Sequence, residues 1–167
     1  MREEIFLTDY VEEDTTNFFL KKLRYYNSRR KFYYKSCNMR GDYFGTVGLL
    51  PFVDDGFSIH LDRVKKKVEK AASRALTYYY FHMLDYKKGG DMLIHNHQHS
   101  EDYTSLLYLN DSTDGSTFFI EGDKKYEVLP EKNKLLMYPS YVDHGSNYST
   151  SKKVAVFGFH FKYKFLS

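Results

Sequence analysis

The feature that most restricts the fold of this chain is a change of hydrophobic period near Leu76. From there onward, apolar and polar residues alternate in short runs, which is the pattern of half-buried strands. Turn-forming residues such as Gly115, Gly122 and Pro130 interrupt the runs. The pattern predicts strands over residues 76–86, 92–97, 104–110, 116–121, 124–129, 134–138, 144–148 and 154–163.

The first 75 residues carry helical patterns instead. An acidic patch at residues 12–14 is followed by apolar residues at helical spacing, which predicts a helix from about Thr15 to Tyr26. A second helix is expected to be capped by Ser58 and to carry an apolar stripe as far as Ala75. Short strands are expected over residues 4–8 and 31–36.

Two helices ahead of many short antiparallel strands predict an α+β, mainly β fold. The expected architecture is a double-stranded β-helix, the jelly-roll or cupin-like arrangement, with the N-terminal helices packed on one sheet. A chain of 167 residues with 42% hydrophobic residues suits one core, so residues 1–167 are expected to form one domain. Its helical part would be residues 1–75 and its jelly-roll core residues 76–167.

The charge and cysteine content restrict the possible partners. A net charge of +3 is mild, so the basic runs at residues 29–31 and 65–67 are expected to be solvated faces, not a nucleic-acid footprint. The sequence shows no long apolar run, so neither a signal peptide nor a membrane span is predicted. The lone cysteine, Cys37, precludes an internal disulfide framework. The sequence therefore predicts a cytoplasmic protein with no nucleic-acid or membrane partner.

The segment Tyr86 to Glu101 is the stretch in which candidate metal ligands are most concentrated. In it His95, His97 and His99 alternate with polar residues, so on an extended strand all three would project from one face. A divalent transition metal, iron or zinc, is the simplest reason to gather imidazoles in this way. A polar strand edge with chance histidines is the alternative.

A third metal ligand is expected from a distant strand. His144 follows a predicted strand, a proline turn and a short loop, which suits that role. The remaining histidines stand alone in the sequence and are expected to have ordinary structural roles; they are His60, His82 and His160.

Five elements in order resemble the 2-oxoglutarate/Fe(II)-dependent oxygenases, in particular the prolyl 4-hydroxylase-like branch and its small bacterial and phage relatives. They span residues 86–161 and read Tyr86-x-x-Gly89-x5-His95-x-His97, Thr104-Ser-Leu-Leu-Tyr108-Leu-Asn110, Gly115-Ser-Thr-Phe118, Tyr138-Pro-Ser-x3-His144 and Lys153-Val-Ala-Val156. The resemblance implies that His95 and His144 are iron ligands. It also implies that Tyr108 and Lys153 hold the far carboxylate of 2-oxoglutarate.

The sequence departs from that family at one position. Where the family pattern has an aspartate, this chain has His97, so the implied ligand set is His95, His97 and His144. The same stretch also matches the opening cupin motif, in which Glu101 would be a further ligand. A shifted register, with His99 and Glu101 as ligands, would restore two histidines and a carboxylate.

These observations leave three hypotheses about function. The first is a 2-oxoglutarate- and Fe(II)-dependent oxygenase that hydroxylates a small molecule or a protein side chain. The second is a cupin-like metal enzyme, such as a thiol dioxygenase, that does not use 2-oxoglutarate. The third is a non-catalytic jelly-roll binding module.

Overall fold

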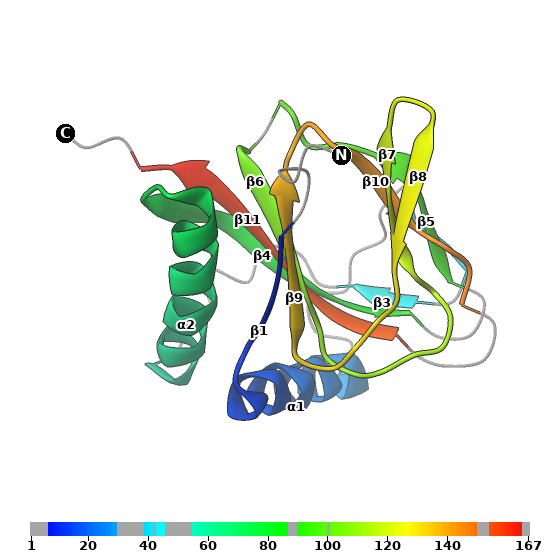
Figure 1. The fold of residues 1–167 in the computed structure, drawn as a ribbon. Helices are drawn as coiled ribbons and strands as arrows, with labels where there is room; N and C mark the ends of the chain where they lie inside the picture. The colour runs from blue at the N-terminus through cyan, green and yellow to red at the C-terminus, as the bar shows by residue number, and fades with distance from the viewer. Residues whose placement is uncertain are drawn as a thin grey trace.

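The described part of the chain folds into two facing antiparallel sheets with two helices (Figure 1). The computed structural model describes residues 7–29, 39–41, 43–45, 55–86, 90–99, 101–149 and 154–164. Every strand pairing among them is antiparallel. This arrangement confirms the predicted fold class, a mainly β double-stranded β-helix with helices on one sheet.

The larger sheet has six strands and is built around the long central pair. In spatial order its strands are β1 (Leu7–Tyr10), β9 (Lys134–Pro139), β6 (Tyr103–Tyr108), β11 (Val154–Tyr163), β4 (Leu76–Tyr86) and β3 (Tyr43–Gly45). The predicted bounds of β4 and β11 are those of the structure. Both strands have long apolar and aromatic runs, which suit pleated, buried surfaces.

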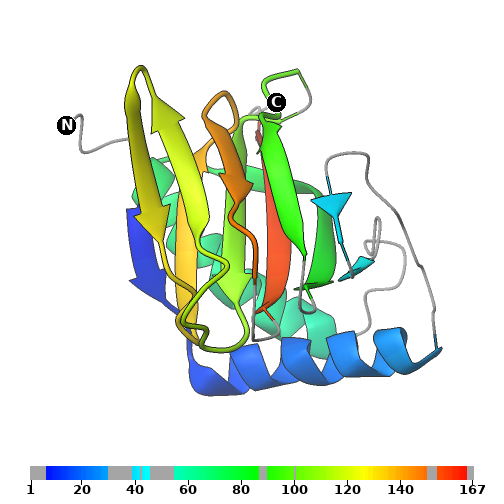
Figure 2. The same ribbon diagram turned by 90° about the vertical axis from the view of Figure 1, so that its right-hand side faces the viewer.

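The smaller sheet has five short strands. In spatial order they are β2 (Met39–Arg40), β5 (Asp91–His95), β10 (Asp143–Ser146), β7 (Thr117–Glu121) and β8 (Lys124–Val128). The turn between β7 and β8 contains Gly122 at φ 58°, a left-handed conformation that glycine adopts without a steric penalty. Side by side in Figure 2, β8, β7, β10 and β5 form the wall opposite the larger sheet.

The N-terminal part contributes strands as well as helices. A strand expected over residues 4–8 is present at β1, slightly further along, and it closes one edge of the larger sheet against β9. The short strands β2 and β3 also come from this part and extend both sheets. The strand predicted over residues 31–36 and the single cysteine, Cys37, lie outside the described residues.

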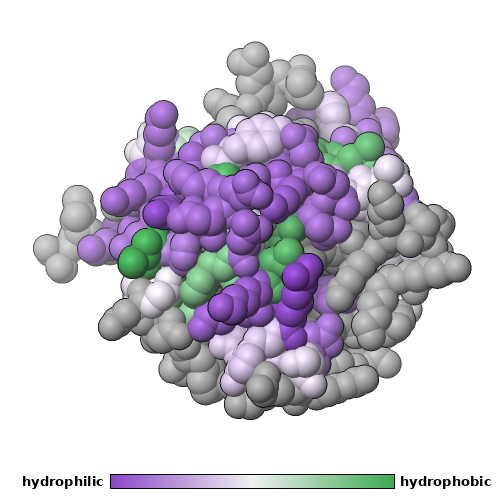
Figure 3. All heavy atoms as spheres, turned by 90° about the horizontal axis from the view of Figure 1, so that it is seen from below, coloured by the Kyte–Doolittle hydropathy of each residue, from purple (hydrophilic) through white to green (hydrophobic). Residues whose placement is uncertain are grey.

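Both helices pack on the outer face of the six-stranded sheet. Helix α1 (Glu13–Arg29) starts two residues earlier than predicted, with the carboxylates of Glu13 and Asp14 at the positive end of its dipole. Helix α2 (Asp55–Ala72) has Ser58 within its first turn, so the prediction that Ser58 caps the helix is wrong. None of the described helices is long and apolar enough to cross a membrane. The described surface on the α1 side is largely hydrophilic (Figure 3).

The described residues form two hydrophobic cores, one on each side of the larger sheet. The outer core joins both helices to this sheet and includes Phe19, Val64, Phe81 and Phe159. The inner core lies between the sheets and consists of Leu84, Tyr86, Tyr108, Phe119, Leu136, Tyr138 and Val142. A sheet with both faces covered holds its strands in fixed register. This register positions the histidines described next.

Candidate metal centre

Strand pairing brings the first and the distal predicted ligand together. His95 ends β5, and His144 lies directly opposite it on β10. Directly opposed residues in an antiparallel pair have adjacent side chains on one face. The centroids of the two imidazole rings are accordingly 4.4 Å apart.

The third predicted ligand, His97, lies just beyond the end of β5. Its backbone N–H donates to the carbonyl of Ser140 (2.8 Å), which fixes the loop against the turn that leads to β10. Its ring centroid is 4.9 Å from that of His95 and 5.3 Å from that of His144. One ring nitrogen from each of the three histidines lies within 4.8 Å of the others. The fold thus gathers His95, His97 and His144 from two separate segments.

His99 does not join this group. Because β5 ends at His95 and the chain then turns, the alternation predicted for an extended strand stops there. The imidazole of His99 is exposed and contacts the side chain of Gln98. The prediction that three histidines share one strand face is therefore wrong for His99, and the shifted register loses one of its two ligands.

Hydrogen bonds determine which nitrogen of His95 and of His144 can bind a metal. The Nδ1 atoms of His95 and His144 each lie 2.9 Å from a backbone carbonyl two residues earlier, that of Leu93 and that of Val142. A carbonyl only accepts, so each Nδ1 carries the proton and donates it. The lone pair is then on Nε2, which is the arrangement of a metal-ligating histidine.

Burial keeps these imidazoles neutral, as metal binding requires. Desolvation lowers the pKa of His95 and of His97, and it holds the pKa of the buried His144 well below the ordinary value of 6.5. His95 and His97 are half-buried while His144 is only 4% exposed. The donor set is therefore closed on the β10 side and reached by solvent from the β5 side.

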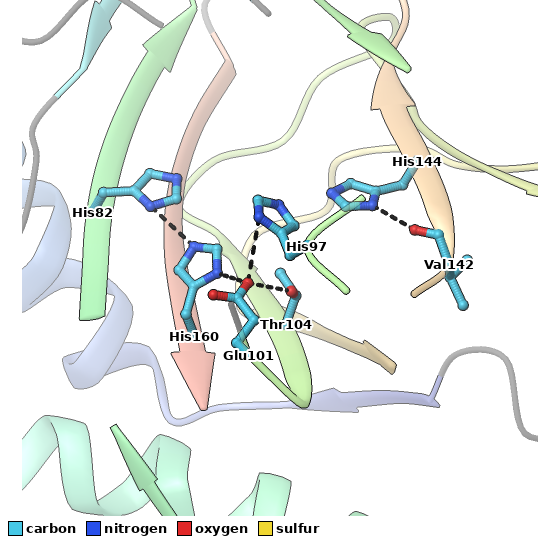
Figure 4. Close-up of polar contacts among 7 residues, drawn as sticks. All are labelled: His82, His97, Glu101, Thr104, Val142, His144 and His160. Atoms are coloured by element: carbon cyan, nitrogen blue, oxygen red, sulfur yellow. Dashed lines mark hydrogen bonds and ion pairs between the residues drawn. The ribbon is translucent and has the colours of Figure 1, made fainter. Parts of the chain in front are cut away.

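A row of further polar side chains continues from His97 on the side away from His144 (Figure 4). The buried carboxylate of Glu101 contacts His160 Nδ1, accepts from Thr104 Oγ1 (3.0 Å) and lies 3.5 Å from His97 Nδ1. His160 Nε2 in turn lies 3.1 Å from His82 Nδ1. The ring of Tyr80 is stacked on that of His160, with the two ring centroids 3.9 Å apart.

The expectation that His82 and His160 stand alone is therefore wrong. They lie diagonally across the β4–β11 pair, because strand pairing places His160 opposite Tyr80 and Gly158 opposite His82. Their inward orientation was available from the period-two pattern, since the flanking Phe159 and Phe161 face the helices. The contact of His160 with Glu101 was not available, because it depends on the loop before β6. His60 lies apart from this row and bonds Thr15 Oγ1 (2.9 Å).

Tyr108, the predicted partner of the 2-oxoglutarate carboxylate, is fully buried between the sheets. Its hydroxyl lies 2.6 Å from Thr117 Oγ1 and 3.3 Å from the carbonyl of Val128. Burial raises the pKa of this phenol, so it stays protonated. The phenol O–H thus donates within the protein, toward Thr117 Oγ1 and the Val128 carbonyl. The other predicted anchor, Lys153, lies outside the described residues.

A cavity of about 500 Å³ adjoins the row on the side of the end of α2. Glu101 and Asp102 form part of its wall, together with Tyr103, Tyr141 and Tyr163. The carboxylate of Asp102 accepts from the backbone N–H of Tyr163 (2.8 Å), which joins the loop to β11. The cavity lies between the loop that carries Glu101 and the end of α2.

Solved structures resemble this fold over almost its whole length. A prolyl-4-hydroxylase from Pseudomonas putida superposes with a TM-score of 0.72 at 13% identity, covering 98% of this chain and 95% of the other. The chain has the fold of the 2-oxoglutarate/Fe(II) oxygenases. HygX from Streptomyces hygroscopicus, with nickel and 2-oxoglutarate bound, superposes with a TM-score of 0.75 at 12% identity, covering 98% and 85%.

A third solved structure has the same fold. A prolyl hydroxylase from Trichoplax adhaerens, in complex with a peptide fragment of hypoxia inducible factor, superposes with a TM-score of 0.72 at 15% identity. It covers 96% of this chain and 84% of its own. No family model and no curated protein matches the sequence. At these identities the similarity concerns the fold, so the function is argued from the residues.

Proposed function

We propose that this protein is a 2-oxoglutarate- and Fe(II)-dependent oxygenase whose metal ligands are His95, His97 and His144. The observation that carries the proposal is the convergence of three neutral imidazoles, two of them with Nδ1 held by a carbonyl and Nε2 left to bind. Imidazole suits iron as well as zinc. The neighbour HygX, which holds nickel and 2-oxoglutarate on the same fold, supports this choice.

We assign separate roles to the metal ligands and to the residues that bind 2-oxoglutarate. His95, His97 and His144 would hold the metal and leave its other positions for ligands. Tyr108 and Lys153 would bind the far carboxylate of 2-oxoglutarate, by a hydrogen bond and a charge respectively. When bound, iron and 2-oxoglutarate supply the oxidising chemistry, and the protein orients them and excludes water.

The substrate class is a small molecule or a protein side chain. The exposed edges of His95 and His97 leave the metal side accessible from solvent, which suits either kind of substrate. Among the structural neighbours, HygX has been seen with hygromycin B and the Trichoplax enzyme with a peptide. We expect the protein to act in the cytoplasm without nucleic-acid or membrane partners.

The deciding experiment uses the purified protein with Fe(II) and 2-oxoglutarate under anaerobic conditions. A visible charge-transfer band is expected on mixing, and succinate is expected once oxygen is admitted. The His144→Ala variant, which removes the buried ligand, should show neither. Iron binding without the band, and without succinate, would refute the use of 2-oxoglutarate.

One observation favours the second candidate, a cupin-like enzyme that does not use 2-oxoglutarate. The donor set has three histidines and no carboxylate, whereas non-haem iron oxygenases commonly use two histidines and a carboxylate. In this case oxygen consumption with a thiol such as cysteine would proceed without 2-oxoglutarate. A protein that binds no iron, zinc or nickel after reconstitution would instead be a binding module.

A further inference from the structure

Each histidine of the proposed metal site has an oxygen atom facing its Nδ1, but one of the three oxygens differs from the others. His95 and His144 face neutral backbone carbonyls. His97 Nδ1 instead faces the carboxylate of Glu101, whose Oε1 lies 3.5 Å away. His97 thus differs from His95 and His144 in that its Nδ1 faces a carboxylate.

Local backbone geometry places the carboxylate there. Glu101 follows His97 by four residues, and its N–H donates to the His97 carbonyl (3.3 Å), which closes a turn. Residues four apart in such a turn lie on the same side of it. The turn therefore brings the glutamate side chain beneath the imidazole.

The carboxylate is held in place from two other strands. Its side chain is 0% exposed, and burying a charge without hydrogen bonds would be costly. Thr104 on β6 donates to Oε1 (3.0 Å), and His160 on β11 contacts the same atom through Nδ1. His160 is itself fixed by His82 (3.1 Å). The oxygen is therefore oriented by a network that extends through the larger sheet (Figure 4).

We propose that Glu101 is a positioning residue for the metal site, which acts on the metal through His97. Its carboxylate would accept the Nδ1–H of His97, fix the tautomer that presents Nε2, and make that nitrogen a stronger donor. It would also place a negative charge near a divalent ion whose three ligands are all neutral. The inference rests on the ligand set of the proposed function.

Glu101 also belongs to a second group of possible ligands with His97 and His160, whose donor atoms lie within 4.8 Å of one another. The hydrogen bonds of Oε1 favour the positioning role. Thr104 and His160 both direct protons toward this oxygen, so it serves as an acceptor inside the protein. Direct coordination by Glu101 is the outcome that the experiment must separate from positioning.

The test is Co(II) binding by the full chain, followed by calorimetry and by the visible ligand-field spectrum. Glu101→Gln keeps the shape and an acceptor oxygen for Thr104 but removes the charge. We expect Co(II) affinity to fall by roughly 10- to 100-fold, with the ligand-field bands of the wild type retained because the three imidazoles still bind. Asp102→Asn removes the neighbouring carboxylate and should leave both affinity and spectrum unchanged.

Four outcomes would overturn the inference. A folded Glu101→Gln variant that binds Co(II) as tightly as the wild type would show that the carboxylate does not act on the metal. An altered spectrum in both Glu101→Gln and His160→Gln would show that Glu101 is itself a ligand. An equal loss of affinity in Asp102→Asn would show only a general charge effect. Wild-type binding by His95→Asn would instead refute the ligand set of the proposed function, and the positioning role with it.

A second variant covers the case in which Glu101→Gln does not fold. Thr104→Val is close in size and removes one hydrogen bond to Oε1 without changing any charge. We expect a few-fold loss of Co(II) affinity, with the spectrum and the melting temperature near those of the wild type. Unchanged affinity in a folded Thr104→Val variant would overturn the proposed role.

Discussion

Gly145 provides a sensitive test of how strand packing maintains the proposed metal site. It follows His144 on β10, between β5 and β7. A Cβ added here would lie 2.6 Å from Phe118 Cζ and 2.7 Å from the backbone carbonyl oxygen of Met92. The second distance is about 0.7 Å short of the 3.4 Å at which ordinary contacts begin. The Phe118 ring can shift, but the Met92 oxygen moves only with β5.

The expected effect of Gly145→Ala is therefore twofold. Overpacking in a well-packed sheet costs about 1–3 kcal/mol of unfolding free energy. In addition, β5 must move away from β10, and these strands carry His95 and His144 directly opposite each other. A shift of about 0.7 Å exceeds the roughly 0.2 Å tolerance of metal–ligand distances. We expect Co(II) affinity to fall by roughly tenfold or more.

The measurements are urea unfolding of the metal-free protein and calorimetric Co(II) titration. Gly122→Ala is the matched control, because Gly122 has φ 58° and no atom within 4 Å of an added Cβ. It should lose about 1–2 kcal/mol from backbone strain alone and bind Co(II) normally. If Gly145→Ala is destabilised to the same extent as Gly122→Ala and also binds Co(II) normally, the spacing of β5 and β10 does not control the proposed metal site.

Three further predictions concern the cosubstrate and pH. Lys153→Ala should abolish 2-oxoglutarate binding while Fe(II) stays bound; unchanged cosubstrate affinity in a titration would exclude Lys153 as the anchor. Tyr108→Phe should weaken 2-oxoglutarate binding and leave Fe(II) affinity unchanged, and a loss of both would indicate a structural defect. Burial holds the pKa of His82, His144 and His160 well below 6.5, so the unfolded chain binds protons that the folded chain does not. The unfolding free energy of the metal-free protein should therefore fall as the pH drops through 6.5 toward these lower values, and a flat profile by urea unfolding would contradict this.

Local patterns were sufficient to predict the strands of the core. The alternation from Leu76 onward arises because successive side chains of a strand point to opposite faces of the sheet. Each strand predicted between residues 76 and 163 was found within a few residues of its expected bounds. Helix boundaries were less well predicted. Ser58 was a plausible cap by residue type, yet the helix begins at Asp55, because residues outside the apolar stripe carry little information about where a helix starts.

The sequence by itself also predicted that histidines from distant segments would gather into one group. A His-x-His pair at a strand end and His144 after a distant turn were enough to predict the group of three, which β5–β10 pairing brings together. Periodicity could not show that the chain turns after His95, so His99 was placed on the wrong face. The turn is decided by the contact of the His97 backbone with Ser140, more than forty residues later.

Only the tertiary structure decided which side chains gather near Nδ1 of His97, a proposed metal ligand. Glu101 and Thr104 lie only three residues apart, but His160 follows Glu101 by 59 residues, and no local spacing relates it to them. Their contacts arise because β6 and β11 are neighbours in the larger sheet, with Thr104 directly opposite His160. Sequence patterns determine which residues face inward, whereas long-range pairing determines which inward-facing residues meet.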